Sequence, residues 1–81
     1  MIVRYFAAAR AAAGVAEEQV EAATLGAALA VVRASHGSRL GEVLDRCSFL
    51  VDGDPVGLRD PFGVATGPQS VADCLPPFAG G

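Results

Sequence analysis

This sequence predicts an α+β domain in which one main helix packs on one face of a mixed β-sheet. Three observations support that fold class. The chain has 81 residues, enough for a single small domain. Apolar residues make up 52% of it, which allows one hydrophobic core. One strongly helical segment is preceded and followed by strand-like segments, a pattern typical of α+β folds.

The first part of the chain is expected to supply two strands. Residues 2–6 are β-branched or aromatic around one arginine, which is typical of a strand. The alanine-rich residues 7–13 are too few for a stable isolated helix, so we expect a loop that bridges two strands. Residues 15–22 place glutamates between apolar residues, and we interpret them as a second strand with one solvated face.

The helical segment is residues 25–35. Its apolar residues recur at spacings of three and four, so they line one face of a helix. Thr24 precedes the segment as a good N-cap, and Gly37 follows it in the position of a left-handed C-cap. Residues 40–44 then indicate a second short helix or turn.

The second half of the chain is expected to complete the sheet. Residues 48–51 form an apolar run that we interpret as a central strand, and residues 52–55 have the composition of a tight turn. We expect residues 56–58 to pair back as an edge strand, residues 60–67 to form a loop, and residues 71–75 to form the last strand. The core closes only if the first and last strands are neighbours, and that arrangement is a ubiquitin-like β-grasp.

The predicted domain covers residues 1–75, and residues 76–81 are expected to be a flexible tail that ends in Gly-Gly. The core is expected to combine apolar strand residues with the apolar face of the helix. Its predicted members are Val3, Phe6, Leu29, Val32, Phe49 and Val51.

Charge and hydropathy exclude several kinds of partner. Nine acidic and six basic residues give a net charge of −3, which disfavours nucleic acid and anionic membrane surfaces. The apolar runs fall far short of the roughly 20 residues that a membrane span requires. The opening residues lack the pattern of an export signal, so we expect a cytoplasmic protein.

Catalytic and metal-binding side chains form no recognisable motif, and neither a metal nor a bound cofactor is expected. Cys47 and Cys74 lack metal-ligand spacing and are expected to be free, partly buried thiols. His36, the single histidine, is interpreted as a helix-capping or solvated residue. The glutamates within residues 17–21 are interpreted as a solvated strand face, with a contact surface for a basic partner as the alternative.

The C-terminal sequence is the most informative about function. Gly80 and Gly81 have no side chains, so this backbone can enter a channel too narrow for any Cβ atom. Pro76 and Pro77 stiffen the exit from the domain, and six extended residues reach roughly 20 Å. Such a tail would present the Gly81 carboxylate as the reacting group, after activation, for instance as an acyl-adenylate. A frayed terminus is the alternative interpretation.

Both ends of the chain resemble one family. Residues 3–10 with Gly14 look like the opening of the small, sulfur-carrier subunit of molybdopterin synthase, in the MoaD/ThiS family, and residues 75–81 look like its C-terminal signature. The resemblance covers the whole chain in length and element order. The chain departs from the family at residues 67–70, which are Gly-Pro-Gln-Ser where the family often has an acidic-Gly-Asp turn.

The resemblance implies a sulfur carrier, the non-catalytic sulfur-donating subunit of a synthase. A ubiquitin-activating-type adenylyltransferase would use ATP to adenylate the Gly81 carboxylate, and a sulfurtransferase donor would convert it to a thiocarboxylate. The tail would enter the large subunit of molybdopterin synthase and donate sulfur to cyclic pyranopterin monophosphate, while the body docks through an apolar sheet face. The tail contacts would be Pro76, Pro77, Phe78, Ala79 and Gly80.

Three alternatives remain open. A sulfur carrier for thiamine thiazole or cysteine biosynthesis would share the fold and the Gly-Gly end, although residues 5–10 and the double proline favour the molybdopterin branch. A ubiquitin-like protein modifier would join Gly81 to lysines of its targets, but this chain has no lysine through which to form polymers of itself. A pure interaction module would tolerate truncation of the tail.

Overall fold

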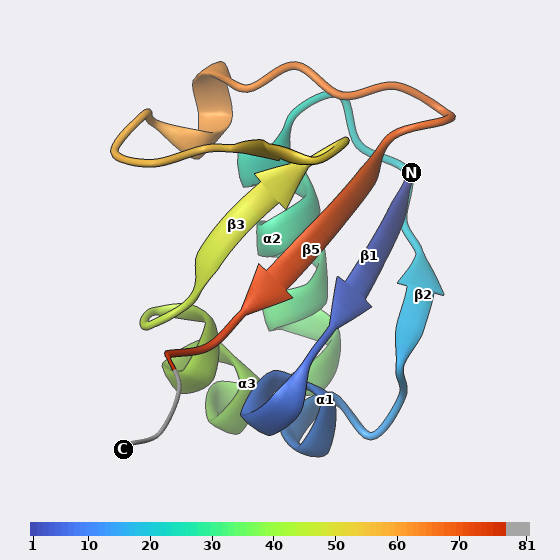
Figure 1. Cartoon of the computed structure of the whole chain (residues 1–81). Helices are drawn as coiled ribbons and strands as arrows, with labels where there is room; N and C mark the ends of the chain where they lie inside the picture. The colour runs from blue at the N-terminus through green and yellow to red at the C-terminus, as the bar shows by residue number, and fades with distance from the viewer. Residues whose placement is uncertain (78–81) are drawn as a thin grey trace.

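A computed structural model of the chain describes residues 1–77 and contains a five-stranded mixed sheet with the strand order β2-β1-β5-β3-β4 (Figure 1). The strands are β1 (Ile2–Tyr5), β2 (Glu17–Gln19), β3 (Ser48–Val51), β4 (Asp54–Pro55) and β5 (Val71–Leu75). The helices are α1 (Ala7–Ala13), α2 (Leu25–His36), α3 (Ser38–Leu44) and the short 3₁₀ helix η1 (Pro61–Gly63). β1 and β5 pair in parallel and the other strand pairs are antiparallel, so the predicted β-grasp is confirmed.

Residues 7–13 form the helix α1, so the loop expected there is wrong. Phe6 has an extended backbone before the helix, and the N–H of Gly14 donates to the Arg10 carbonyl at 2.9 Å at its end. Ala9 is fully buried, and α1 packs beside α3. These tertiary contacts stabilise a helix that is too short to hold by itself.

The helix α2 crosses behind the sheet, while α1 and α3 lie at one end of it (Figure 1). The Thr24 hydroxyl accepts a hydrogen bond from the Ala27 N–H at 3.1 Å, which confirms the predicted N-cap. The helix runs one residue past the predicted end, to His36. Gly37 has φ +87° but ψ −169°, so it is not the left-handed cap that was expected; it joins α2 directly to α3.

The strands β3 and β4 form a tight hairpin around Asp52 and Gly53. These residues have φ values of +51° and +85°, as a two-residue type I′ turn requires. The Asp52 carboxylate also accepts a hydrogen bond from the Val71 N–H at 2.9 Å, which ties the turn to the start of β5. The edge strand is therefore Asp54–Pro55 and not residues 56–58, because the turn is completed two residues earlier than expected. The strand β3, which was expected to be central, lies next to the middle strand of the sheet, and the middle strand is β5.

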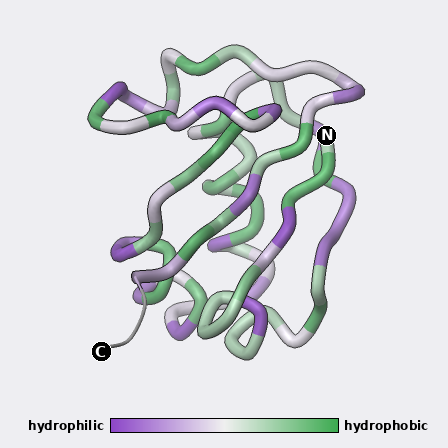
Figure 2. The backbone as a smooth tube through the Cα atoms, in the orientation of Figure 1, coloured by the Kyte–Doolittle hydropathy of each residue, from purple (hydrophilic) through white to green (hydrophobic). Residues whose placement is uncertain are grey.

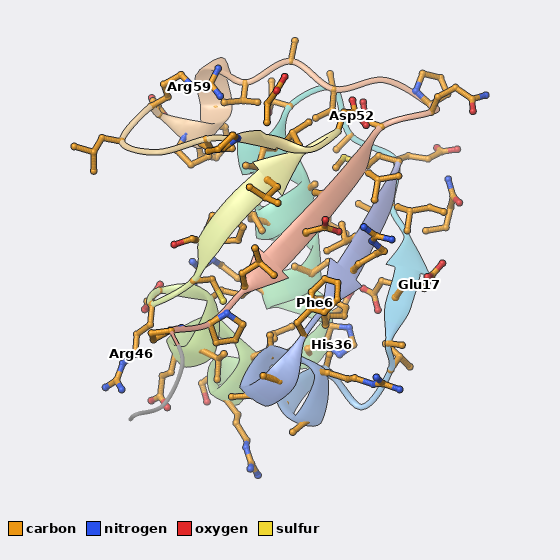
Figure 3. The ribbon with its side chains drawn as sticks, viewed as in Figure 1. Phe6, Glu17, His36, Arg46, Asp52 and Arg59 are labelled. Carbon is orange, nitrogen blue, oxygen red and sulfur yellow. The ribbon has the colours of Figure 1, made fainter. Side chains whose placement is uncertain are left out.

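The core lies between the sheet and α2. Val3, Leu29, Val32 and Val51 are buried as predicted, and Phe49 is partly buried against them. Phe6 is the exception, with 39% of its surface exposed, so its predicted place in the core is wrong. Side chains alternate between the two faces of a strand. Because Val3 and Tyr5 point inward, Phe6, the residue after Tyr5, points to the other face. Figure 3 shows the Phe6 ring in front of the sheet, beyond the end of β1.

The remaining expectations about regular structure are met in part. The strand β2 occupies only the centre of the predicted residues 15–22, whereas β5 has the predicted bounds. Within the predicted loop, residues 61–63 form η1 and Ala65 makes an isolated bridge to Thr24. Among residues 1–77, no helix is long and apolar enough to cross a membrane.

Candidate functional site

Within residues 1–77, the helices lie behind the sheet or at its end, and no helix covers the opposite face of the sheet (Figure 1). Because Val3, Tyr5, Ala72 and Cys74 point into the core, the residues between them on β1 and β5 point outward. We call this surface the open face. It consists of a central pair of charged residues, Arg4 and Asp73, with the apolar residues Ile2, Phe6, Leu50, Val71 and Leu75 around it.

Arg4 and Asp73 face one another directly across the parallel pair β1 and β5. Arg4 Nε donates to Asp73 Oδ1 at 2.6 Å, and Arg4 Nη2 donates to Oδ2 at 2.9 Å, so the contact is bidentate. The hydrogen bond to Asp73, with the charge of its carboxylate, raises the pKa of Arg4 above its ordinary value. The Asp73 side chain is only 12% exposed while that of Arg4 is 45% exposed, so the arginine presents the outer surface of the pair.

Two further residues border this ion pair. The Arg4 guanidinium carbon lies 5.8 Å from the centre of the Phe6 ring, within the range of a cation–π contact. Glu17 is the β2 residue in register with Arg4, and it is exposed (Figure 3). Neither Arg4 nor Asp73 is among the functional residues predicted from the sequence. The sequence did contain a pattern that could have predicted this ion pair. Each of two apolar strands has one charged residue at its centre, the two charges are opposite, and the two strands were expected to be neighbours.

The strand β5 leads from the open face directly to the base of the tail. Leu75 is the last residue of β5, and it pairs with Ser48. Pro76 is half-buried and Pro77 is exposed, and β5 ends near α3 (Figure 1). The other predicted tail residues, Phe78, Ala79, Gly80 and Gly81, lie outside the described residues. The assignments of the tail contacts and of the Gly81 carboxylate therefore stay predictions.

Both cysteines are free thiols, as predicted. Cys74 is buried on the core side of β5, and Cys47 is partly buried just before β3. Burial raises the pKa of Cys47 to about 11 and that of Cys74 to about 12. Cys47 Sγ also donates a hydrogen bond to the Val43 carbonyl at 3.3 Å. Both thiols are protonated near neutral pH, so neither has the thiolate character of a sulfur-transferring nucleophile.

His36 lies against Glu18, so the expected capping or solvated role for this histidine is wrong. Its Nε2 atom lies 2.8 Å from Glu18 Oε2 and 3.1 Å from Oε1, and the two side chains are 19% and 25% exposed. The Tyr5 ring meets the imidazole edge-on, with centroids 6.1 Å apart. Glu18 points toward the helix side of β2, whereas Glu17 and Glu21 are exposed, so only part of the expected acidic face is solvated.

Among residues 1–77, His, Cys, Asp and Glu side chains form no group of three that could hold a metal ion. The structure places two candidate features next to one another: the open face, with its central ion pair, and the base of the tail at Pro76. This arrangement is suited to binding another macromolecule.

The sequence matches no family model, and it matches no curated protein. Solved structures do share its fold. The solution structure of small archaeal modifier protein 1 from Methanosarcina acetivorans matches with a TM-score of 0.85 and 19% identity, over 99% of this chain and 94% of that one. The crystal structure of small archaeal modifier protein 1 from Haloferax volcanii matches with a TM-score of 0.76 and 23% identity, over 94% of each chain.

A third match comes from the complex of subunits 1 and 2 of molybdopterin-converting factor from Helicobacter pylori 26695. A chain of that complex matches with a TM-score of 0.72 and 21% identity, over 99% of this chain and 96% of that one. The fold and these matches define the class: this chain is a small protein with the ubiquitin-like β-grasp fold. Within that class, it is similar in structure both to archaeal modifier proteins and to a chain of a molybdopterin-converting factor.

Proposed function

We propose that this chain is a sulfur carrier that bears a C-terminal thiocarboxylate on Gly81 and serves as the small subunit of molybdopterin synthase. One observation carries the proposal. The last strand of the β-grasp sheet ends at Leu75, and the sequence continues directly as Pro-Pro-Phe-Ala-Gly-Gly. The structural similarity to a chain of the Helicobacter pylori molybdopterin-converting factor supports it.

The proposed chemistry takes place on the terminal carboxylate. A Gly81 carboxylate oxygen attacks the α-phosphorus of ATP in a ubiquitin-activating-type adenylyltransferase, and pyrophosphate leaves. Sulfide supplied by a sulfurtransferase donor adds to the acyl carbon, and AMP leaves, so a thiocarboxylate remains. Within the large subunit, the thiocarboxylate sulfur adds to an electrophilic carbon of cyclic pyranopterin monophosphate. Water then cleaves the resulting thioester, so the sulfur stays on the pterin and the Gly81 carboxylate is regenerated. The carrier contributes no catalytic side chain to these steps, which agrees with the raised pKa values of Cys47 and Cys74.

The proposed partner of this chain is the large subunit of molybdopterin synthase. The matching Helicobacter pylori chain was solved as part of a complex of subunits 1 and 2. On this proposal, the open face of our chain packs against the large subunit while the tail reaches its active site. The apolar residues of the open face supply contact area, and Leu75 lies directly before Pro76 at the base of the tail.

A second candidate function is supported by the similarity to two archaeal modifier proteins. A modifier would use the same activated Gly81 carboxylate, but the acceptor would be the amine of a target lysine in place of a pterin precursor. The absence of lysine from this chain would then prevent chain-on-chain polymers through its own side chains. The two functions therefore differ in the acceptor and share the activation step.

Reconstitution separates these functions. The carrier is incubated with the adenylyltransferase, ATP, sulfide, the large subunit and cyclic pyranopterin monophosphate. The proposal predicts that molybdopterin forms and that the thiocarboxylate is consumed as it does so. Formation of covalent conjugates with lysine-containing proteins, without any molybdopterin, would contradict the proposal and favour the modifier.

A further inference from the structure

The ion pair at the centre of the open face is unusual in its surroundings. Asp73 is in register with Arg4 on one side and with the apolar Leu50 on the other. The apolar residues Ile2 and Val71 are also in register with each other, at the start of β1 and β5. Figure 2 shows hydrophilic stretches of β1 and β5 next to one another within strands that are otherwise largely hydrophobic. Any protein that covers this face must therefore accommodate a charged pair inside an apolar contact.

The Arg4 guanidinium still has free donors. Its Nε and one N–H of Nη2 are taken by Asp73, whereas Nη1 has no acceptor among residues 1–77. The side chain is 45% exposed, so water can satisfy the remaining N–H groups in the free protein. A purely apolar partner surface would remove that water and leave the donors unpaired, which is unfavourable.

The charges around Arg4 determine which acceptor suits it. Asp73 already balances the charge of Arg4, and the exposed Glu17 adds a negative charge on the β2 side. A carboxylate placed opposite Arg4 would be close to two like charges. A neutral oxygen, from a backbone carbonyl or an Asn or Gln side chain, meets the free N–H groups without that repulsion. Glu17 itself is complementary to a basic residue.

We infer that Arg4 is the specificity-determining residue of the open face. The partner is the large subunit, and its contact surface is largely apolar. That surface places a neutral carbonyl oxygen opposite Arg4 and a basic residue opposite Glu17. The inference rests on the proposed function and specifies its partner. The base of the tail, at Pro76, supports this choice. Pro76 follows Leu75 of the open face, so a protein that receives the tail lies beside this face.

The test measures the dissociation constant of the full chain for the purified large subunit by titration calorimetry. The informative variant is Arg4→Leu/Asp73→Leu, which removes both members of the central ion pair, so neither charge is left without its partner. Arg39→Leu, at an exposed arginine of α3 outside the open face, is the matched control. Thermal unfolding of each variant ensures that only folded protein is compared.

We expect the double variant to bind roughly tenfold or more weakly, because the carbonyl oxygen of the partner loses its donors, and Arg39→Leu to stay within about twofold. We also expect Glu17→Gln to reduce the salt dependence of the affinity. Double-variant binding as tight as wild type, or tighter, would show a wholly apolar partner and overturn the inference. A salt dependence unchanged in Glu17→Gln would overturn the assignment of the basic residue.

Thiocarboxylate formation by the adenylyltransferase, measured on the same samples, separates this inference from the proposed function. If the wild-type chain is thiocarboxylated but does not bind the large subunit, the inference fails and the carrier chemistry stands. If no thiocarboxylate forms, the proposed function fails, and the comparison of dissociation constants still decides whether Arg4 and Asp73 control docking.

Discussion

Glu18 and His36 join the edge strand β2 to the end of α2, with Glu18 Oε2 2.8 Å from His36 Nε2. The contact closes one side of the core next to Tyr5, whose ring meets the imidazole edge-on. The strand β2 has only three residues and sits at the edge of the sheet, where it pairs with β1 alone. A side-chain contact to α2 therefore supplements a short set of backbone hydrogen bonds.

The first prediction concerns this contact. Glu18→Gln removes the carboxylate from a partly buried pair, so we expect the free energy of unfolding to fall by about 1 to 2 kcal/mol. Glu21→Gln, at an exposed position, should change it by less than about 0.5 kcal/mol. Urea unfolding at neutral pH measures both. Equal effects of the two substitutions would show that the contact between β2 and α2 adds nothing to stability.

The second prediction compares two large apolar residues that the sequence analysis had placed together in the core. Leu29 is 6% exposed beneath the sheet, whereas Phe6 is 39% exposed on the open face. Leu29→Ala should cost roughly 2–5 kcal/mol of stability, as expected for a truncated core leucine. Phe6→Ala should cost less than Leu29→Ala, roughly 1–2 kcal/mol, because two fifths of the Phe6 surface is already exposed in the folded protein. The reverse order in chemical denaturation would mean that the faces of the sheet are misassigned.

The third prediction concerns alkaline pH. Burial raises the pKa of Cys74 from its ordinary 9.0 to about 12, so the folded protein keeps a proton that the unfolded chain releases. Stability from this thiol is complete below pH 9 and is lost as the pH rises toward 12. Cys47 acts in the same direction between pH 9 and about 11. Urea unfolding at a series of pH values should show this decline, and it should be shallower in Cys47→Ala/Cys74→Ala. Identical slopes would contradict the assignment to the thiols.

The fourth prediction concerns Gly26 on α2. A Cβ atom at this position would come within 2.5 Å of the Phe62 ring, which packs across the helix from η1. In the wild type, Gly26→Ala should therefore be neutral or destabilising despite the better helix propensity of alanine. In a Phe62→Ala background, the same substitution should stabilise the protein by about 1 kcal/mol. A double-mutant cycle measures the difference, and additive effects would count against the contact between the two residues.

Much of the fold followed from local pattern. The periodicity of α2, the Thr24 cap and the bounds of β5 are set by residues close in sequence, and these were predicted well. The helix α1 was missed because its stability comes from packing beside α3, which local propensity does not describe. The position of β4 was missed because Asp52 takes a positive φ and completes the turn with Gly53 in two residues.

The site was harder to predict, because it depends on register. Opposite charges at Arg4 and Asp73 are visible in the sequence, but their pairing requires β1 and β5 to be parallel with these two residues opposite each other. A shift of one residue would place one of them in the core. The contact between Glu18 and His36 likewise depends on which face of β2 points toward α2.

The fifth prediction concerns the tail. Deleting Gly81 should abolish sulfur transfer and leave the melting temperature unchanged, because the sheet ends at Leu75. Gly80→Ala should also impair transfer, since its methyl group would meet the walls of a channel fitted to glycine. Both variants are assayed for molybdopterin formation, with a thermal melt of each as the control for folding. Full activity without Gly81 would contradict this prediction and favour the alternative interpretation of the tail as a frayed terminus.

The most direct test is the intact mass of the chain after incubation with the adenylyltransferase, ATP and sulfide, followed by fragmentation of the C-terminal peptide. We predict a gain equal to the exchange of one oxygen for one sulfur, located on Gly81 and preserved in Cys47→Ser/Cys74→Ser. The chain that lacks Gly81 serves as the control and should show no gain. No gain in the wild-type chain, or sulfur located on a cysteine, would contradict the sulfur-carrier account.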